Sequence, residues 1–169
     1  MANITVAKLK KLIDEQNQEH FVGTDFSGLD LSDFNFSNLT LMRCDFTKTK
    51  LLKANFTKAF LEESNFKGSN MHYADFTDAK LKKANFAWCD LTDANFADAD
   101  LTGAVFAGAN LRNAKLTFAV MEKADLRSAK LSSTSFFGAN LANADLTGCK
   151  PDKTIWTKAD LTGAKGYKP

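Results

Sequence analysis

From Phe26 to Leu146 every fifth residue is Phe, Leu or Met, in an unbroken register of twenty-five positions. In an α-helix a five-residue step advances about 500°, so these side chains would scatter around the axis. In a flat strand the odd step would place them on alternating faces. We therefore predict a solenoid, in which the chain turns a corner once per repeat and each short extended segment presents its central side chain to a common axis.

The remaining positions of the repeat agree with this geometry. Two residues before the central position lies, with few exceptions, a small residue, most often alanine, as at Ala54 and Ala74. Residues two apart on an extended segment share a side, so the small residue also points inward and lets the coils stack closely. The residue between them is most often Asp or Asn and points outward, and the two residues after the centre are typical of turns.

Units of the form Ala-(Asp/Asn)-Leu-x-Gly, as at residues 99–103 and 144–148, resemble the repeats of the pentapeptide-repeat family. The resemblance covers roughly four fifths of the chain. It implies an all-β fold, a right-handed quadrilateral (four-sided) parallel β-helix solenoid with four pentapeptides in each coil.

The central residues support a coil with an even number of repeats independently of this resemblance. They alternate between Phe and Leu or Met with a period of ten residues from Phe26 to Leu111, so like residues stack on like only in an even-sided coil. The predicted ladders are Phe26, Phe46, Phe66, Phe86 and Phe106 on one side, and Phe36, Phe56, Phe76 and Phe96 on the opposite side.

The N-terminal end of the solenoid is predicted to carry a short capping α-helix over residues about 4–19, because its apolar residues follow helical spacing. The spacing places Ile4, Leu9, Leu12, Ile13 and Gln16 on one helical face, and an apolar floor for them is expected from Leu29, Phe34 and Leu39. A detachable helix that binds a partner is the alternative to a cap.

At the other end, Pro151 takes a central position and cannot donate to a ladder, so the register is expected to break there. Trp156 then resumes the period. The predicted division of the chain is a capping helix over residues 1–20, the β-helix over residues 21–150, and an imperfect final coil with a loose tail from Gly166 over residues 151–169.

Three cysteines, Cys44, Cys89 and Cys149, occupy the small inward position. Their spacing puts them on different coils, too far apart for a disulfide, so we expect buried thiols and a reducing compartment. The first residues lack the apolar core of a signal peptide and no segment approaches membrane-spanning length. These features predict a cytoplasmic protein, with secretion by a route without a cleaved signal as the alternative.

The net charge of +2 is unevenly distributed, since residues 101–169 hold ten basic and five acidic side chains. This asymmetry could orient a partner but falls short of a nucleic-acid footprint. We expect a protein partner, neither nucleic acid nor membrane, and a monomer rather than a dimer.

The sequence gives no reason to expect an enzyme, because a narrow filled rod with flat walls lacks the concave site that catalysis requires. His20 and His72 are interpreted as solvated surface residues. Asp78 and Asp98 should stack about 5 Å apart on a convex corner and stay solvated. No catalytic residue, metal ligand or cofactor is therefore predicted.

Apolar side chains at outward positions are more informative, because the repeat has no structural need for them. The candidate partner-binding residues are Trp88, Tyr73, Phe118, Val120 and Phe137. The alternative is that they pack against the chain's own tail or lie flat over neighbouring Gly and Ala.

A non-catalytic scaffold for protein–protein interaction through exposed solenoid faces is the function that these features favour. The family resemblance implies a second hypothesis, a DNA mimic that binds a type II topoisomerase (gyrase), as in quinolone-resistance pentapeptide-repeat proteins. Such mimicry depends on a strongly acidic wall, whereas the C-terminal third of this chain is basic.

Overall fold

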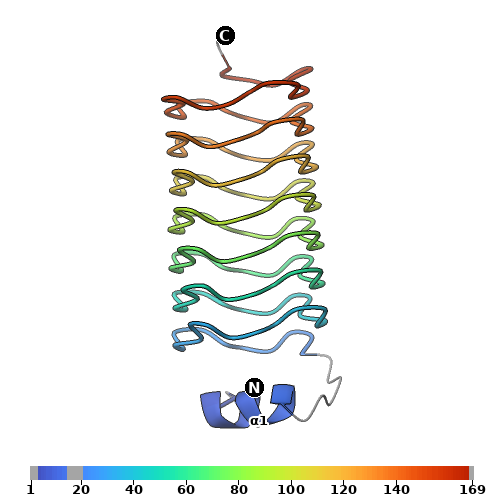
Figure 1. Cartoon of the computed structure of the whole chain (residues 1–169), viewed down its shortest axis with the longest axis vertical. Helices are drawn as coiled ribbons and strands as arrows, with labels where there is room; N and C mark the ends of the chain where they lie inside the picture. Colours follow the sequence, from blue (N-terminus) through green and yellow to red (C-terminus); the bar gives the residue numbers. More distant parts are fainter. Residues whose placement is uncertain (1–3, 15–20, 168–169) are drawn as a thin grey trace.

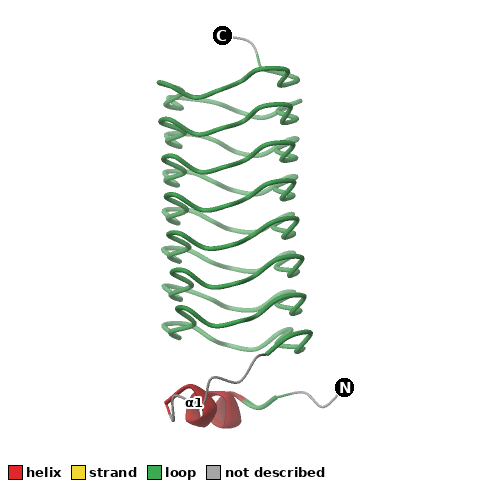
Figure 2. Cartoon of the chain, turned by 90° about the vertical axis from the view of Figure 1, so that its right-hand side faces the viewer, coloured by secondary structure: helices red, strands yellow, loops and turns green. Residues whose placement is uncertain are grey.

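The computed structural model describes residues 4–14 and 21–167. The chain forms a rod of stacked coils, with helix α1 (Val6–Asp14) across the N-terminal end (Figures 1 and 2). Each outward wall residue bridges in parallel to the residue twenty positions later, from Asp25↔Asp45 to Asp145↔Lys165. Four repeats therefore complete one coil, as predicted, and the fold is a right-handed four-sided β-helix. Each side is so short that it contributes one bridging residue to its ladder.

Each corner is a four-residue turn that begins at a central residue. The N–H of Leu29 donates to the carbonyl of Phe26 at 3.2 Å, and the same bond recurs along the rod. The third turn residue has a positive φ at every corner from Gly23 to Gly163, as a type II turn requires. Most of these positions hold residues other than glycine, so the backbone ladder maintains a conformation that L-residues seldom adopt.

Backbone bonds between coils use three of the five N–H groups in a repeat, and the turn uses a fourth. The N–H of Phe26 donates to the carbonyl of Asp45 at 2.7 Å, and that of Asp45 to the carbonyl of Thr24 at 3.0 Å. In the described coils, the N–H just after the central residue has no backbone partner. The outward Asp or Asn side chain accepts it, as Asp25 Oδ1 does from the Ser27 N–H at 2.9 Å. The repeat favours Asp and Asn there because they complete the backbone's hydrogen bonding.

The Phe ladders are confirmed. Phe46 and Phe66 stack with ring centroids 4.8 Å apart and 4° between their planes. Phe56 of the opposite ladder meets Phe66 edge to face at 5.8 Å and 84°. The rings thus combine parallel stacking along the rod with T-shaped contacts across it, and all of them are fully buried.

Small polar residues at the inward position donate their side-chain hydrogen to a backbone carbonyl. Ser64 Oγ donates to the Leu41 carbonyl at 2.7 Å, Thr134 Oγ1 to the Leu111 carbonyl at 2.7 Å, and Cys89 Sγ to the Phe66 carbonyl at 2.9 Å. Each bond spans twenty-three residues and so joins adjacent coils. A hydroxyl or thiol therefore replaces an alanine methyl without leaving a buried donor unpaired.

Two of the three cysteines are buried as predicted, and the third is not. Burial raises the pKa of Cys44 to about 11 and that of Cys89 to about 12. Cys149 is only half-buried, because it lies in the last coils, where less of the chain stacks above it. All three cysteines are free thiols, without a disulfide bond.

Helix α1 contacts the first coil through its apolar face. Leu9 is fully buried, and Ile4 and Leu12 pack against the core. Leu29, Phe34 and Leu39, which were expected to form the apolar floor below the helix, also pack against the core. Gln16, the rest of the expected helix beyond Asp14, and His20 lie outside the described residues.

The predicted break in register at Pro151 is wrong. The corner and the bridge Ser135↔Ile155 continue through it. A central N–H donates to the carbonyl nineteen residues later. For position 151 this acceptor would lie outside the described residues, so the missing proline N–H removes no bond of the described structure.

The tail is not loose throughout, because Tyr167 packs edge to face against Trp156 at 5.3 Å. Trp156 in turn stacks on Phe136 at 4.7 Å. The start of the tail therefore covers part of the last coil's apolar cross-section.

Replacement of Phe76 by Ala should lower the free energy of unfolding by about 3–5 kcal/mol, because it removes a buried rung that contacts rings above, below and across. Ala104→Leu should cost about 1–3 kcal/mol, because the added bulk meets stacked coils. Chemical denaturation followed by circular dichroism measures both changes. Phe60→Ala, on an outer wall, is the control and should cost less than either, and equal losses for Phe60→Ala and Phe76→Ala would contradict the inward assignment.

The thiols should react with an alkylating reagent in a fixed order, Cys149 first and Cys44 and Cys89 only on unfolding. A raised pKa and a blocked approach both slow the buried pair. Mass spectrometry of the native protein after timed labelling measures the order. Labelling of Cys89 as fast as Cys149 would show that the central coils are open.

Acid should destabilise the rod through its turn carboxylates. Hydrogen bonds from the Ser or Thr two residues later lower the pKa values of Asp25, Asp30, Asp145 and Asp160 below the ordinary value. A lowered folded-state pKa stabilises the fold above the unfolded pKa of about 3.9, and this stability is lost as the pH falls through the folded pKa. We expect the thermal midpoint to fall between about pH 5 and about pH 2.

The quadruple Asp→Asn variant at these positions is the control for the acid prediction. Asn keeps the acceptor oxygen but does not titrate, so the midpoint should depend less on pH than in the unmodified chain. Parallel pH curves for the two proteins would assign acid sensitivity to other groups.

Candidate protein-binding surfaces

Trp88 occupies a positive-φ corner position, with φ 61°, and its side chain is 67% exposed. The indole lies over the backbone of Gly108, one coil later, where a Cβ would come within 2.5 Å of the ring. In its column Trp88 has Gly68 one coil earlier and Gly108 one coil later, and the ring lies over Gly108. The backbone beneath the indole is therefore shielded, and its outer face is left to the solvent.

Tyr73 is 53% exposed and occupies the next corner around the rod, one coil earlier. Its ring stacks on that of His72, with centroids 4.2 Å apart. His72 Nε2 lies 3.1 Å from Asp93 Oδ2, within hydrogen-bond distance, so His72 is half-buried and hydrogen-bonded rather than the solvated residue that we expected. In the described part of the chain no ring contact joins Tyr73 to Trp88, and a wall of the rod separates them.

Phe118 and Phe137 come together on a third corner. Their centroids are 5.6 Å apart and the rings meet edge to face at 81°. Phe118 is 54% exposed, has φ 56°, and lies over Gly138, where a Cβ would be 2.5 Å from its ring. Lys158 Nζ lies 5.4 Å from the Phe137 centroid, a contact that the sequence analysis missed.

Val120 is exposed on the wall that begins at the Phe118 corner, two residues further along the chain. We call Phe118, Phe137 and Val120 the phenylalanine patch. The described start of the tail packs on Trp156 instead, so the packing that supports the patch comes from the rod itself.

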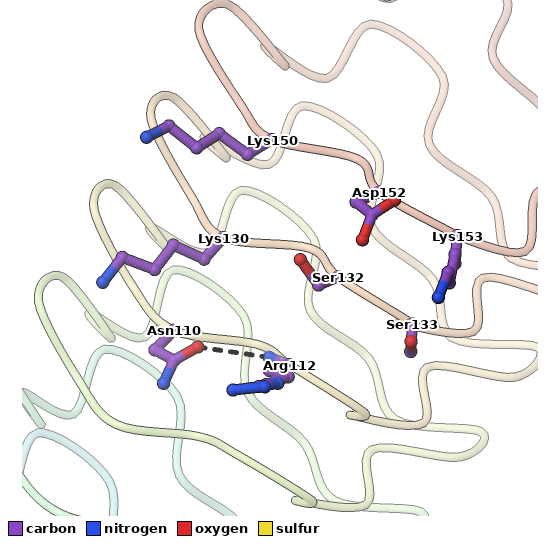
Figure 3. A pocket seen from close by; sticks show the side chains of 8 residues that line it. All are labelled: Asn110, Arg112, Lys130, Ser132, Ser133, Lys150, Asp152 and Lys153. Carbon is purple, nitrogen blue, oxygen red and sulfur yellow. Dashed lines mark hydrogen bonds between the residues drawn. The ribbon is translucent and has the colours of Figure 1, made fainter.

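A shallow basic groove lies on another wall near the C-terminal end, with a volume of about 500 Å³ (Figure 3). Its lining residues are Asn110, Arg112, Lys130, Ser132, Ser133, Lys150, Asp152 and Lys153. The sequence analysis noted only that this third of the chain is basic. The twenty-residue spacing of Lys130 and Lys150 was the signal that could have located the groove.

The carboxylate pair and the possible metal ligands that the sequence raised can be located in the described residues. Asp78 and Asp98 are exposed at a corner. Within residues 4–14 and 21–167, no group of three or more His, Cys, Asp or Glu side chains is arranged to hold a metal ion. Helix α1, the helix found in this part of the chain, is too short to span a membrane.

Comparisons with protein families identify the repeat. A family described as the pentapeptide repeat region matches residues 39–116. A second, described as pentapeptide repeats in 8 copies, matches residues 20–57, 104–143 and 139–165. No curated protein matches the chain.

Solved structures of pentapeptide repeat proteins are also similar to this chain. A trypsin-treated form of QnrB1, a plasmid-mediated fluoroquinolone resistance protein, is 21% identical with a TM-score of 0.66, over 90% of this chain and 79% of that one. A pentapeptide repeat protein from Nostoc PCC 7120 is 27% identical with a TM-score of 0.50, over 60% of this chain and 83% of that one. A third, from the Arabidopsis thaliana thylakoid lumen, is 33% identical with a TM-score of 0.32, over 73% and 69%.

Proposed function

The chain belongs to the pentapeptide repeat family, and we propose that it is a non-catalytic, rigid scaffold that binds a protein partner through its exposed walls and corners. The observation that carries this proposal is the placement of Trp88, Tyr73 and Phe118. Each has a positive φ at a corner and is more than half exposed. A bulky residue is disfavoured in that conformation, so the backbone conformation gives no reason for an aromatic residue there.

The rod supplies the rigidity that a scaffold needs. Backbone bonds join each coil to the next, and the interior is filled by Phe, Leu and Met. Side chains on such a frame are held in place before binding, which lowers the entropy cost of forming an interface. Trp and Tyr are also the residues most often found to dominate binding energy.

Two surfaces can act as anchors. Trp88 stands at one corner, with Tyr73 at the next, and the phenylalanine patch occupies a third. Rings that rest on glycine backbone have little freedom to collapse further, so their outer faces remain available for a partner. We propose a cytoplasmic, monomeric protein that uses at least one of these two surfaces and needs no cofactor.

A DNA mimic that binds a type II topoisomerase is the competing function, and QnrB1 shares the fold. Likeness at 21% identity extends to the fold alone. Mimicry of DNA needs a continuous acidic surface, whereas the basic groove puts Arg112, Lys130, Lys150 and Lys153 on one wall. A supercoiling assay with purified gyrase distinguishes the two functions, since a scaffold of the proposed kind leaves gyrase activity unchanged.

The aromatic anchors can be tested by replacing each one with a residue that occurs at another position of the same column. Trp88→Gly copies Gly108, and the pair Phe118→Asn with Phe137→Thr copies Asn38 and Thr117. These variants should fold like the unmodified chain. At least one should weaken capture of the partner from native-host extract by about 2 kcal/mol, roughly thirtyfold, as quantified by mass spectrometry.

Phe60→Lys is the matched control, because it removes an exposed ring outside both surfaces and copies Lys80 of its own column. It should leave capture unchanged. Unchanged capture by both anchor variants, with thermal midpoints equal to that of the unmodified chain, would remove the proposed surfaces. A lowered midpoint for the phenylalanine variant would instead assign Phe118 and Phe137 to the fold.

A further inference from the structure

The basic groove contains two positive charges stacked in one column. Lys130 and Lys150 are twenty residues apart in one column of outward positions and bridge directly through their backbones. Figure 3 shows the two side chains one above the other, pointing out from successive coils. Adjacent strands lie about 4.8 Å apart, and like charges directly opposite each other across a ladder are destabilising.

Another lysine of the same column has an acidic partner. Near its N-terminal end Lys50 stacks on Asp30, and Lys50 Nζ lies 3.6 Å from Asp30 Oδ2. On other walls Lys82 pairs with Asp100 at 3.3 Å, and Arg127 pairs with Asp125 at 2.7 Å. In the groove, by contrast, Arg112, Lys130, Lys150 and Lys153 form no ion pair with any residue that the structure describes.

The groove also presents neutral hydrogen-bonding groups between its cations. Ser132 and Ser133 lie between Arg112 in the coil below and Asp152 and Lys153 in the coil above (Figure 3). Asn110 is already engaged, since its Oδ1 accepts the Arg112 N–H at 3.4 Å. Four cations and two hydroxyls around one depression match a ligand with several anionic oxygens.

We propose that the basic groove binds an acidic segment of a protein partner, a stretch of chain with two or more Asp or Glu residues. The proposal deepens the protein-binding role proposed above, on which it rests. The carboxylates would meet Lys130, Lys150 and Arg112.

Asp152 favours a peptide over DNA as the ligand. Its carboxylate lies among the cations, and in the described structure it has no ion-pair partner. A peptide brings a backbone N–H donor that Asp152 can accept, whereas a DNA phosphodiester backbone offers no donor and would be repelled. Complementary charge of this kind directs partner choice and association rate more than it adds affinity.

The test uses fluorescence anisotropy with a labelled hexaglutamate peptide, a labelled hexaglutamine peptide, and single-stranded and duplex DNA oligonucleotides. The variant is Lys130→Asn with Lys150→Asn, which copies Asn70 and Asn110 of the same column. The unmodified chain should bind hexaglutamate in preference to the other probes, more weakly at about 200 mM than at about 50 mM NaCl. The variant should bind hexaglutamate about tenfold more weakly.

The matched control is Lys58→Asn with Lys83→Asn, which removes the same charge from other corners and copies Asn38 and Asn143. It should leave hexaglutamate binding within about twofold of the unmodified chain. The groove variant should melt no lower than the unmodified chain, because it loses a like-charge contact and gains an Asn that can accept the next turn N–H.

Three results would overturn the proposal: equal losses in the two double variants, no binding of hexaglutamate, or tighter binding of DNA through the same two lysines. The Trp88→Gly and Phe118→Asn/Phe137→Thr variants should keep hexaglutamate binding. Failure of the groove would therefore leave capture through the aromatic anchors intact, and failure of those anchors would leave peptide binding intact.

Discussion

The structure depends on one constraint, the pairing of each coil's backbone with the residue twenty positions further along the chain. Because this ladder continues without insertion from Asp25 to Lys165, side chains between the two end coils have fixed neighbours one coil below and one coil above. The Phe rings accept this spacing with centroid separations of 4.8 Å, as at Phe46 and Phe66. Backbone geometry and ring stacking thus require nearly the same repeat distance, and each reinforces the other.

This shared spacing explains how much of the fold could be predicted from the sequence. A strict five-residue period and a ten-residue alternation determine the Phe ladders, and both are visible in the sequence alone. Pro151 was misjudged, because the cost of a missing N–H depends on whether an acceptor faces it, which is a property of the neighbouring coil. Cys149 was misjudged for a related reason, since burial near the end of a rod depends on what stacks beyond it.

The candidate surfaces were only partly predictable, because a column defines neighbours but not the direction in which a side chain leans. Trp88 has a glycine on both sides in its column and lies over Gly108. Phe118 leans the same way, over Gly138. The two exposed rings therefore rest on the following coil. The sequence of a column lists the neighbours before and after a residue, but it does not show towards which of them the side chain leans. The outward residues were identified correctly by position, while their role in binding stays a prediction.

Fixed neighbours also limit what the rod can do with charge. A loop can move two lysines apart, but two lysines in one column of a rigid ladder can separate only by rotating their side chains away. At Lys50 the chain relieves this constraint with Asp30 in the coil below. At Lys130 and Lys150 it does not, so side-chain rotation, water and salt must reduce the repulsion between the two ammonium groups. An acidic segment bound in the groove, as proposed, would reduce it further and would stabilise the folded rod by binding to it.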